Sequence, residues 1–101
     1  MLKEQFVCFL LLIIAVTSQA QIEFKGTVLD ESNQGIPGVL VKIHELNKAT
    51  VTGIDGDFFF PTIQSGRYRI HLESIGFQSY TLDAAITKSV YFKIQLKESV
   101  N

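Results

Sequence analysis

The stretch 26–60, GTVLDESNQGIPGVLVKIHELNKATVTGIDGDFFF, constrains the fold of this chain more than any other part of the sequence. Apolar and polar residues alternate on both sides of clusters that are rich in glycine, asparagine and aspartate. Alternation with a period of two predicts half-buried strands, and clusters of that composition favour chain reversals. The stretch therefore predicts strand, turn, strand, loop, turn and strand.

The strands and turns of this region can be placed from single residues. Residues 22–29 and 39–46 alternate and are predicted as strands. Pro37 lies between them, and because proline donates no hydrogen bond to a ladder, it predicts that the second strand is entered at a sheet edge. Asp55-Gly56 between extended runs is a strong signal for a two-residue hairpin turn.

The remainder of the chain continues the same pattern. Residues 67–73 and 89–97 alternate cleanly, and 77–82 is predicted to be a further strand. The region around Ala84-Ala85 has the weakest pattern and fits either a loop or one helical turn. About seven short strands with turn signals every 8–12 residues are typical of a β-sandwich.

The first residues of the chain have a different character. Residues 6–16 form an unbroken apolar run, which is too short to cross a bilayer as a helix because that requires roughly 20 residues. Ser18 and Ala20 supply small residues at the two positions that a signal peptidase reads. We predict a signal peptide over 1–20, cleaved after Ala20, and one domain over 21–101; an uncleaved anchor is the alternative.

Cysteine content and charge exclude several classes of function. Cys8, the only cysteine, lies inside the apolar run, so the predicted mature chain has no disulfide and no thiol chemistry. Val7 precedes it and most of the run follows it, which disfavours lipidation. The formal net charge of the whole chain is −1, without a basic stripe, so neither nucleic acid nor an anionic membrane surface is implied as a partner. No second apolar span follows, which predicts a mature chain without a transmembrane segment.

Five motifs, in order and at suitable spacing, resemble the carboxypeptidase regulatory-like domain. They are G-T-V-L-D at 26–30, G-I-P-G-V-L-V at 35–41, T-G-I-D-G-D-F at 52–58, G-R-Y at 66–68 and I-G-F at 75–77. The positions to which we assign structural roles are Gly26, Asp30, Pro37, Gly38, Asp55, Gly56, Phe58, Gly66, Tyr68 and Gly76. The sequence departs from the family at Gly53, where aspartate is common, and at Pro37, which lies closer to Gly38 than usual.

The resemblance implies an all-β fold, a seven-stranded transthyretin- or prealbumin-like Greek-key sandwich with no catalytic role of its own. In Gram-negative bacteria such a domain commonly follows a signal peptide at the start of a TonB-dependent outer-membrane receptor. The expected protein is then exported to the periplasm or outer membrane, as a stand-alone monomer or as the front end of a truncated or larger receptor. Its expected role is that of an interaction or accessory module with a protein partner.

Zinc-peptidase chemistry is not indicated by the histidines. His44-Glu45 begins like the H-E-x-x-H helix motif, but Lys48 stands where the second histidine is needed, and the segment has strand periodicity. His71 is followed by Ser74 rather than by the glutamate of an H-x-x-E pair. No catalytic residue is therefore expected.

Calcium binding and serine catalysis are not indicated either. Asp30, Asp55 and Asp57 lack the spacing of a calcium loop, which must supply six to eight oxygen ligands. No G-x-S-x-G context is present for a serine nucleophile. We therefore expect no metal and no cofactor.

A partner surface remains the best candidate for a functional site. Leu40, Leu46, Phe59 and Tyr91 are predicted on faces opposite the core and would form an apolar patch if they cluster. The alternative is that they are scattered, which is normal for exposed apolar residues. A second function, carbohydrate binding, would need exposed aromatic platforms, for which Phe59 and Tyr91 are the candidates.

Overall fold

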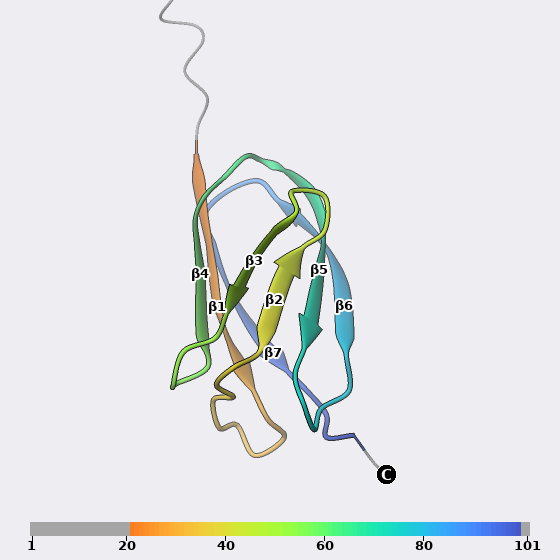
Figure 1. Ribbon diagram of the computed structural model, residues 1–101. Coiled ribbons are helices and arrows are strands. Elements are labelled where there is room, and N and C mark those ends of the chain that lie inside the picture. The colour runs from red at the N-terminus through yellow and green to blue at the C-terminus, as the bar shows by residue number, and fades with distance from the viewer. Residues whose placement is uncertain (1–20, 100–101) are drawn as a thin grey trace, which may run out of the picture.

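The computed structural model describes residues 21–99, and every regular element among them is a strand. The chain order is β1 (Ile22–Leu29), β2 (Leu40–Ile43), β3 (Lys48–Val51), β4 (Asp57–Ile63), β5 (Gly66–Glu73), β6 (Tyr80–Ile86) and β7 (Val90–Gln95). Figure 1 shows these strands as two layers. The prediction of an all-β, seven-stranded sandwich is confirmed. The predicted signal peptide, 1–20, lies outside the described residues.

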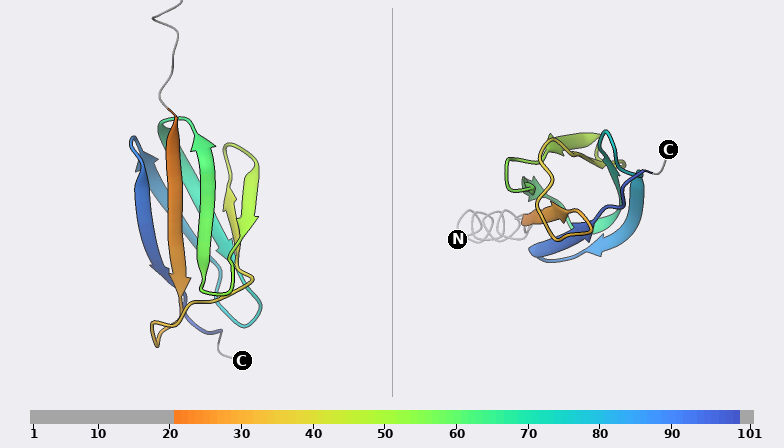
Figure 2. Two further views of the ribbon diagram at one scale, coloured as in Figure 1. Left: turned by 90° about the vertical axis from the view of Figure 1, so that its left-hand side faces the viewer. Right: turned by 90° about the horizontal axis from the view of Figure 1, so that it is seen from below.

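The two layers differ in size and in strand direction. One sheet has three strands in the order β4-β1-β7, and the other has four in the order β3-β2-β5-β6. β1 is antiparallel to β4 but parallel to β7, whereas all the pairs of the larger sheet are antiparallel. Figure 2 shows β1 between β4 and β7, and in its end-on view the two sheets face each other across the core. The long β1 is therefore the centre of the smaller sheet.

The core consists of the inward positions of both sheets. Phe24 of β1 is fully buried, and its ring lies edge-on to those of Phe58 and Phe92, each at 5.3 Å between centroids. The Phe60 ring is stacked on it at 5.8 Å. Such pairs contribute about 0.5–1.5 kcal/mol each beyond the area that they bury. This phenylalanine cluster anchors the three-stranded sheet to the core.

Gly26 provides the room for that cluster. It is the cross-strand neighbour of Phe58 on one side and of Phe92 on the other. A Cβ atom at this position would lie 2.8 Å from the Phe58 ring and 2.3 Å from the Phe92 carbonyl oxygen. A side chain here therefore cannot be accommodated without moving β4 or β7.

The turn at Asp55-Gly56 is present, but it is not the predicted two-residue hairpin. Gly53 and Asp57 close the loop, since the Gly56 amide donates to the Gly53 carbonyl and the Gly53 amide to the Asp57 carbonyl, both at 2.9 Å. Gly56 has a φ of 83°, which favours glycine. The flanking strands β3 and β4 then enter different sheets. The hairpin prediction was wrong because the residues of a loop predict that the chain turns, but they do not predict which sheet the next strand joins.

The edge predicted from Pro37 is also wrong. β2 lies between β3 and β5 and is therefore an interior strand. Pro37 is tolerated because it precedes the strand, and Thr52 satisfies the backbone around it. The Thr52 hydroxyl donates to the Ile36 carbonyl at 2.7 Å and accepts from the Val39 amide at 2.8 Å.

Two other strands have different limits from those predicted. Ala84 and Ala85 lie inside β6, whose residues alternate between buried and exposed up to Ile86, so this segment is neither a loop nor a helical turn. The predicted strand 77–82 begins only at Tyr80, and Phe77 lies in the preceding turn, half-buried against the core. Alanine has low β-propensity, and its place in a strand was decided by pairing with β5.

Candidate binding sites

The four predicted surface residues do not form one patch. Phe59 and Tyr91 both lie on the outer face of the three-stranded sheet and are 47% and 50% exposed. Leu40 is half-buried on β2 in the other sheet, and Leu46 packs against the core from the turn after β2. The assignment of Leu46 to a face opposite the core is therefore not met, because β2 ends at Ile43 and the alternation ends with it.

Phe59 and Tyr91 flank Lys25 in a single cross-strand row. Lys25 on β1 is paired with Phe59 on β4 and with Tyr91 on β7. Neighbouring strands lie about 4.8 Å apart, so the two aromatic residues are separated by about two strand spacings. A shallow depression of about 460 Å³ runs over this row and also touches Glu23 and Asp57. The outer face of the three-stranded sheet thus combines exposed rings with charges of both signs.

A hydrogen-bonded chain fixes this face across all three strands. Thr27 of β1 donates its hydroxyl proton to Asp57 Oδ1 of β4 at 2.6 Å, and its oxygen is bonded to the Tyr91 hydroxyl of β7. Because a threonine hydroxyl has only one proton, Tyr91 must be the donor in the second bond. Thr27 is only 8% exposed although it points outward. Tyr91 is therefore held in one orientation over β1.

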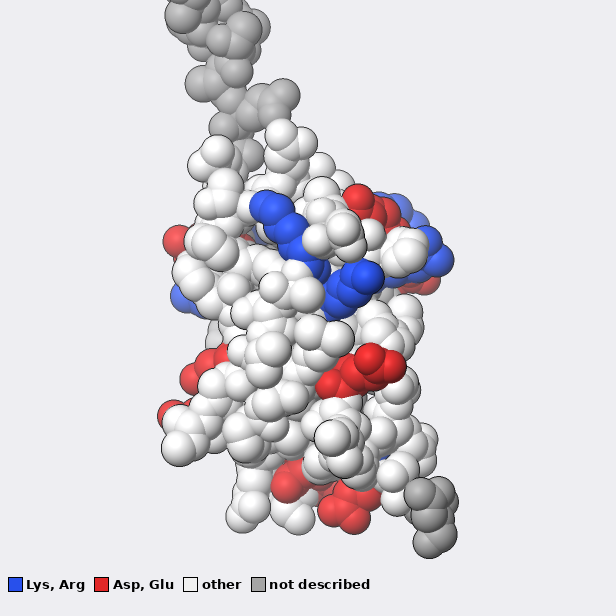
Figure 3. Space-filling model, in the orientation of Figure 1, with Lys and Arg blue, Asp and Glu red and all other residues white. Residues whose placement is uncertain are grey.

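The outer face of the four-stranded sheet carries exposed ion pairs and hydrogen bonds between charged and polar side chains. Arg69 of β5 forms an ion pair with Glu45 at 3.3 Å, and His71 Nδ1 is hydrogen-bonded to the Thr81 hydroxyl at 2.8 Å. His71 Nε2 also lies 3.6 Å from Glu73. Figure 3 shows Lys and Arg side chains gathered over the upper half of this face. These pairs are exposed to water, so they contribute little to stability.

The Glu45 carboxylate accepts hydrogen bonds from Arg69, and they change its pKa. The Arg69 backbone amide donates to Glu45 Oε1 at 2.7 Å, and this bond lowers the pKa of the Glu45 carboxyl below its usual value. The Arg69 guanidinium contributes in the same direction. A lowered carboxyl pKa keeps this group charged at neutral pH and does not indicate a catalytic acid.

A groove crosses the lower end of the same face. It has a volume of about 390 Å³ and is lined by Leu40, Glu73 and Ile75, together with Gly38, Ser74 and Ser79. Ile75 lies at the tip of the turn between β5 and β6 and is fully exposed at 101%. Val51, the cross-strand neighbour of Leu40, is 57% exposed. The groove therefore combines two apolar side chains with two serines and one carboxylate.

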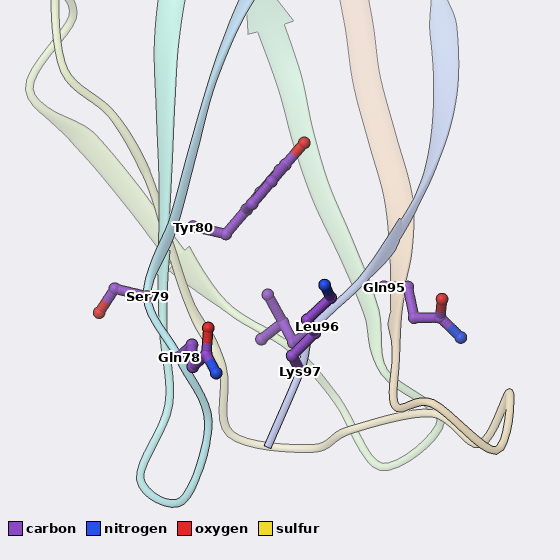
Figure 4. Close-up of a pocket in the computed structure, with 6 residues that line it drawn as sticks. All are labelled: Gln78, Ser79, Tyr80, Gln95, Leu96 and Lys97. Carbon is purple, nitrogen blue, oxygen red and sulfur yellow. The ribbon is translucent and has the colours of Figure 1, made fainter. Parts of the chain in front are cut away.

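A third cavity, of about 250 Å³, lies where the start of β6 approaches the end of β7. Figure 4 shows Tyr80 extending from β6 toward β7, while Gln95 turns away from the space between them. The Gln78 amide donates to the Lys97 carbonyl at 2.8 Å, which ties the two segments together below the cavity. Its lining contains no histidine, cysteine, aspartate or glutamate.

The described residues 21–99 contain no group of three histidine, cysteine, aspartate or glutamate side chains placed to hold a metal ion. His44 lies in the turn after β2, and His71 lies on β5. The Asp30 carboxylate accepts from the amides of Ser32 and Gln34, both at 2.9 Å, which is the role of a turn residue. The histidines and Asp30, which were considered for metal binding, thus lie apart on the surface or serve within turns.

Other motif residues also make hydrogen bonds that fix the backbone. Two residues with such roles, Thr27 and Thr52, were not predicted from the sequence. Tyr68 is 8% exposed and donates to the Gln64 carbonyl at 2.6 Å. Thr27 and Thr52 were not selected, although they are the two buried polar residues of the described chain. Nothing in one sequence distinguishes a buried threonine from an exposed one, because both fit a strand.

Solved structures with this fold come from unrelated contexts. A chain of a type II cohesin–X–dockerin complex from Acetivibrio cellulolyticus has a TM-score of 0.68 at 14% identity, over 76% of this chain and 58% of that one. A 3-chlorocatechol 1,2-dioxygenase from Rhodococcus opacus has a TM-score of 0.64 at 12% identity, over 81% and 61%. A candidate carbohydrate-binding protein from Bacteroides uniformis has a TM-score of 0.58 at 13% identity, over 74% and 40%. This chain therefore spans less than two thirds of these structures, and at such identities the likeness shows the fold alone.

The sequence itself identifies the family. No curated protein matches it. The model of the CarboxypepD_reg-like domain, however, matches residues 24–101, which include β1 from Phe24 onward and all of the other six strands. Residues 21–99 also contain no helix long and apolar enough to be a candidate membrane span. The chain belongs to the CarboxypepD_reg-like domain family.

Proposed function

We propose that this chain is a non-catalytic interaction module, exported to the cell envelope, that positions a protein partner. Domains of its family occur in extracellular and envelope proteins, and the family is regulatory-like rather than catalytic. The observation that carries the proposal is the groove at the lower end of the outer face of the four-stranded sheet, where the exposed Ile75 lies beside the half-buried Leu40. Exposed apolar surface with a polar rim is characteristic of protein interaction sites.

The chemistry of the groove specifies the kind of partner. Glu73 forms part of the wall, and its side chain is 56% exposed. An apolar side chain of the partner would contact Leu40 and Ile75, and a neighbouring lysine or arginine would lie beside Glu73. The expected partner segment is therefore short, with one apolar anchor and an adjacent basic residue, because hot spots combine a desolvated anchor with charge complementarity at the rim.

The end of the described chain lies beside the turn that carries part of the groove. The Ser99 amide donates to the Gly76 carbonyl at 3.0 Å, so the last described residues are held against the turn that carries Ile75. The proposed location rests instead on the motifs that resemble those of the first domain of TonB-dependent receptors. We infer from them that the chain acts in the periplasm or at the outer membrane of a Gram-negative bacterium.

Cell fractionation tests the location. An immunoblot of native cells, with an antibody to this domain, should give either a periplasmic band of the size of residues 21–101 or a far larger band in the outer-membrane fraction. The first result identifies a stand-alone module, and the second identifies the front end of a receptor. A band restricted to the cytoplasm would contradict export.

Site-specific photo-crosslinking in cells tests the interaction. A photoreactive residue at position 75 should give one discrete protein adduct, whose crosslinked peptide contains an apolar residue next to lysine or arginine. Glu73→Lys should abolish that adduct by charge repulsion, and the same probe at position 85, on β6 of the same sheet, is the matched control. Adducts of equal yield from both positions would contradict a specific groove.

Hydrolase activity that is lost on replacing His44 or His71 would overturn the non-catalytic assignment.

A further inference from the structure

The outer face of the three-stranded sheet carries a second constellation that the protein-docking groove does not use. Its centre is the row of Phe59, Lys25 and Tyr91, and its depression of about 460 Å³ also includes Glu23 and Asp57. The groove at Ile75 lies on the opposite sheet. A ligand could therefore occupy this row without competing with a partner at the groove.

The two rings are exposed on one face, and the ring of Tyr91 is fixed in orientation. Phe59 and Tyr91 point outward from β4 and β7 and are about half exposed. The Tyr91 hydroxyl is held by Thr27, and Thr27 is held by Asp57, so the orientation of the Tyr91 ring is set before any ligand arrives. Fixing a ring in advance reduces the entropy that binding must overcome.

The polar groups around the rings favour a neutral ligand with many hydroxyls. Lys25 offers an ammonium donor, and Glu23 and Asp57 offer carboxylate acceptors, so charges of both signs lie within one depression. A strongly charged ligand would meet a like charge on one side. A sugar hydroxyl can both donate to a carboxylate and accept from an ammonium, and the C–H face of a sugar ring packs on the negative face of an aromatic ring.

We propose that this face is a binding site for a neutral oligosaccharide, which stacks on Phe59 and Tyr91 and is hydrogen-bonded by Lys25 and Asp57. The two aromatic residues are separated by about two strand spacings, roughly 10 Å. One sugar ring cannot cover both, so the ligand has at least two rings. The proposal is independent of the protein-docking groove, and either can fail while the other holds.

The test is a titration of the isotope-labelled chain with neutral oligosaccharides, followed by amide resonances. Maltohexaose, cellohexaose, xylohexaose and mannohexaose are added separately up to millimolar concentration. At least one should cause saturable shifts at β1, β4 and β7 around Lys25. Phe59→Ala or Tyr91→Ala should weaken that binding about tenfold, the scale on which one stacking ring contributes for other flat ligands.

Two further variants keep the result interpretable. Tyr91→Phe keeps the ring and removes the bond to Thr27, so binding should weaken less than with Tyr91→Ala. Tyr80→Ala removes a tyrosine that is 46% exposed on the other sheet and should leave binding unchanged. Absence of saturable shifts with all four sugars would overturn the proposal. Equal affinity of the wild-type and Phe59→Ala chains would overturn it as well, and spectra of both chains show whether each is folded.

Discussion

The outer faces of the two sheets arise from the same alternation of residues, yet the contacts between their side chains differ in burial. On the three-stranded sheet, Thr27 is buried under Tyr91 and Asp57, and one hydrogen-bonded chain joins all three strands. On the four-stranded sheet, the contacts of His71 with Thr81 and of Arg69 with Glu45 are exposed. An outward residue therefore becomes structural only when its cross-strand neighbours cover it.

The largest expected effect comes from comparing the inner with the outer face of one sheet. Phe24→Ala should lower the free energy of unfolding by about 3–5 kcal/mol, because it removes the ring at the centre of the phenylalanine cluster. Phe59→Ala, on the same sheet but facing outward, should cost less than about 1 kcal/mol. Urea unfolding followed by circular dichroism measures both, and similar costs for the two variants would contradict the assignment of faces.

The next effect sharpens the contrast between the outer faces. Thr27→Val leaves Asp57 and the Tyr91 hydroxyl without their shared partner and should cost about 1–3 kcal/mol of unfolding free energy. Thr81→Val is the matched change on the other sheet, and it should cost no more than about 0.5 kcal/mol because its partner, His71, is accessible to water. Thermal unfolding of the two variants at pH 7 tests this, and a larger loss for Thr81→Val would refute it.

A smaller effect concerns the pH dependence of the charged face. The pKa of Glu45 is lowered in the folded state, mainly by the Arg69 amide. Its contribution to stability is therefore complete above the unfolded value of 4.5 and is lost as the pH falls through the lowered folded pKa. The melting temperature of the wild type should exceed that of Glu45→Gln at pH 7, and the gap should close below pH 4.5. A gap that is constant down to pH 3 would show that the carboxylate is not involved.

The smallest effect on stability is expected at the groove. Ile75 is fully exposed, so Ile75→Ser should change the unfolding free energy by less than about 0.5 kcal/mol. The same variant should no longer bind the partner of the groove, because the apolar side chain that the partner's anchor contacts is gone. Comparison of urea midpoints with crosslinking from position 74 separates these outcomes. Marked destabilisation would mean that Ile75 packs against the domain.

The sequence alone determined most of the strands, most of their inward residues and the family. Alternation assigned Tyr68, Ile70 and Leu72 to the core, and all three are buried. Turn composition placed a reversal at Asp55-Gly56, and the chain turns there. These features are local, because side-chain period and turn chemistry are set by a few adjacent residues.

Which strands are neighbours, and what covers the outer faces, depends on long-range contacts that the sequence pattern does not specify. The parallel pairing of β1 with β7 joins Lys25 to Tyr91, which are far apart in sequence, and the separation of β3 from β4 overturned the predicted hairpin. The burial of Thr27, the exposure of Ile75 and the packing of Leu46 against the core follow from such long-range contacts. Sequence periodicity fixes the side of a strand on which a residue lies, whereas neighbours from distant strands decide whether water reaches it.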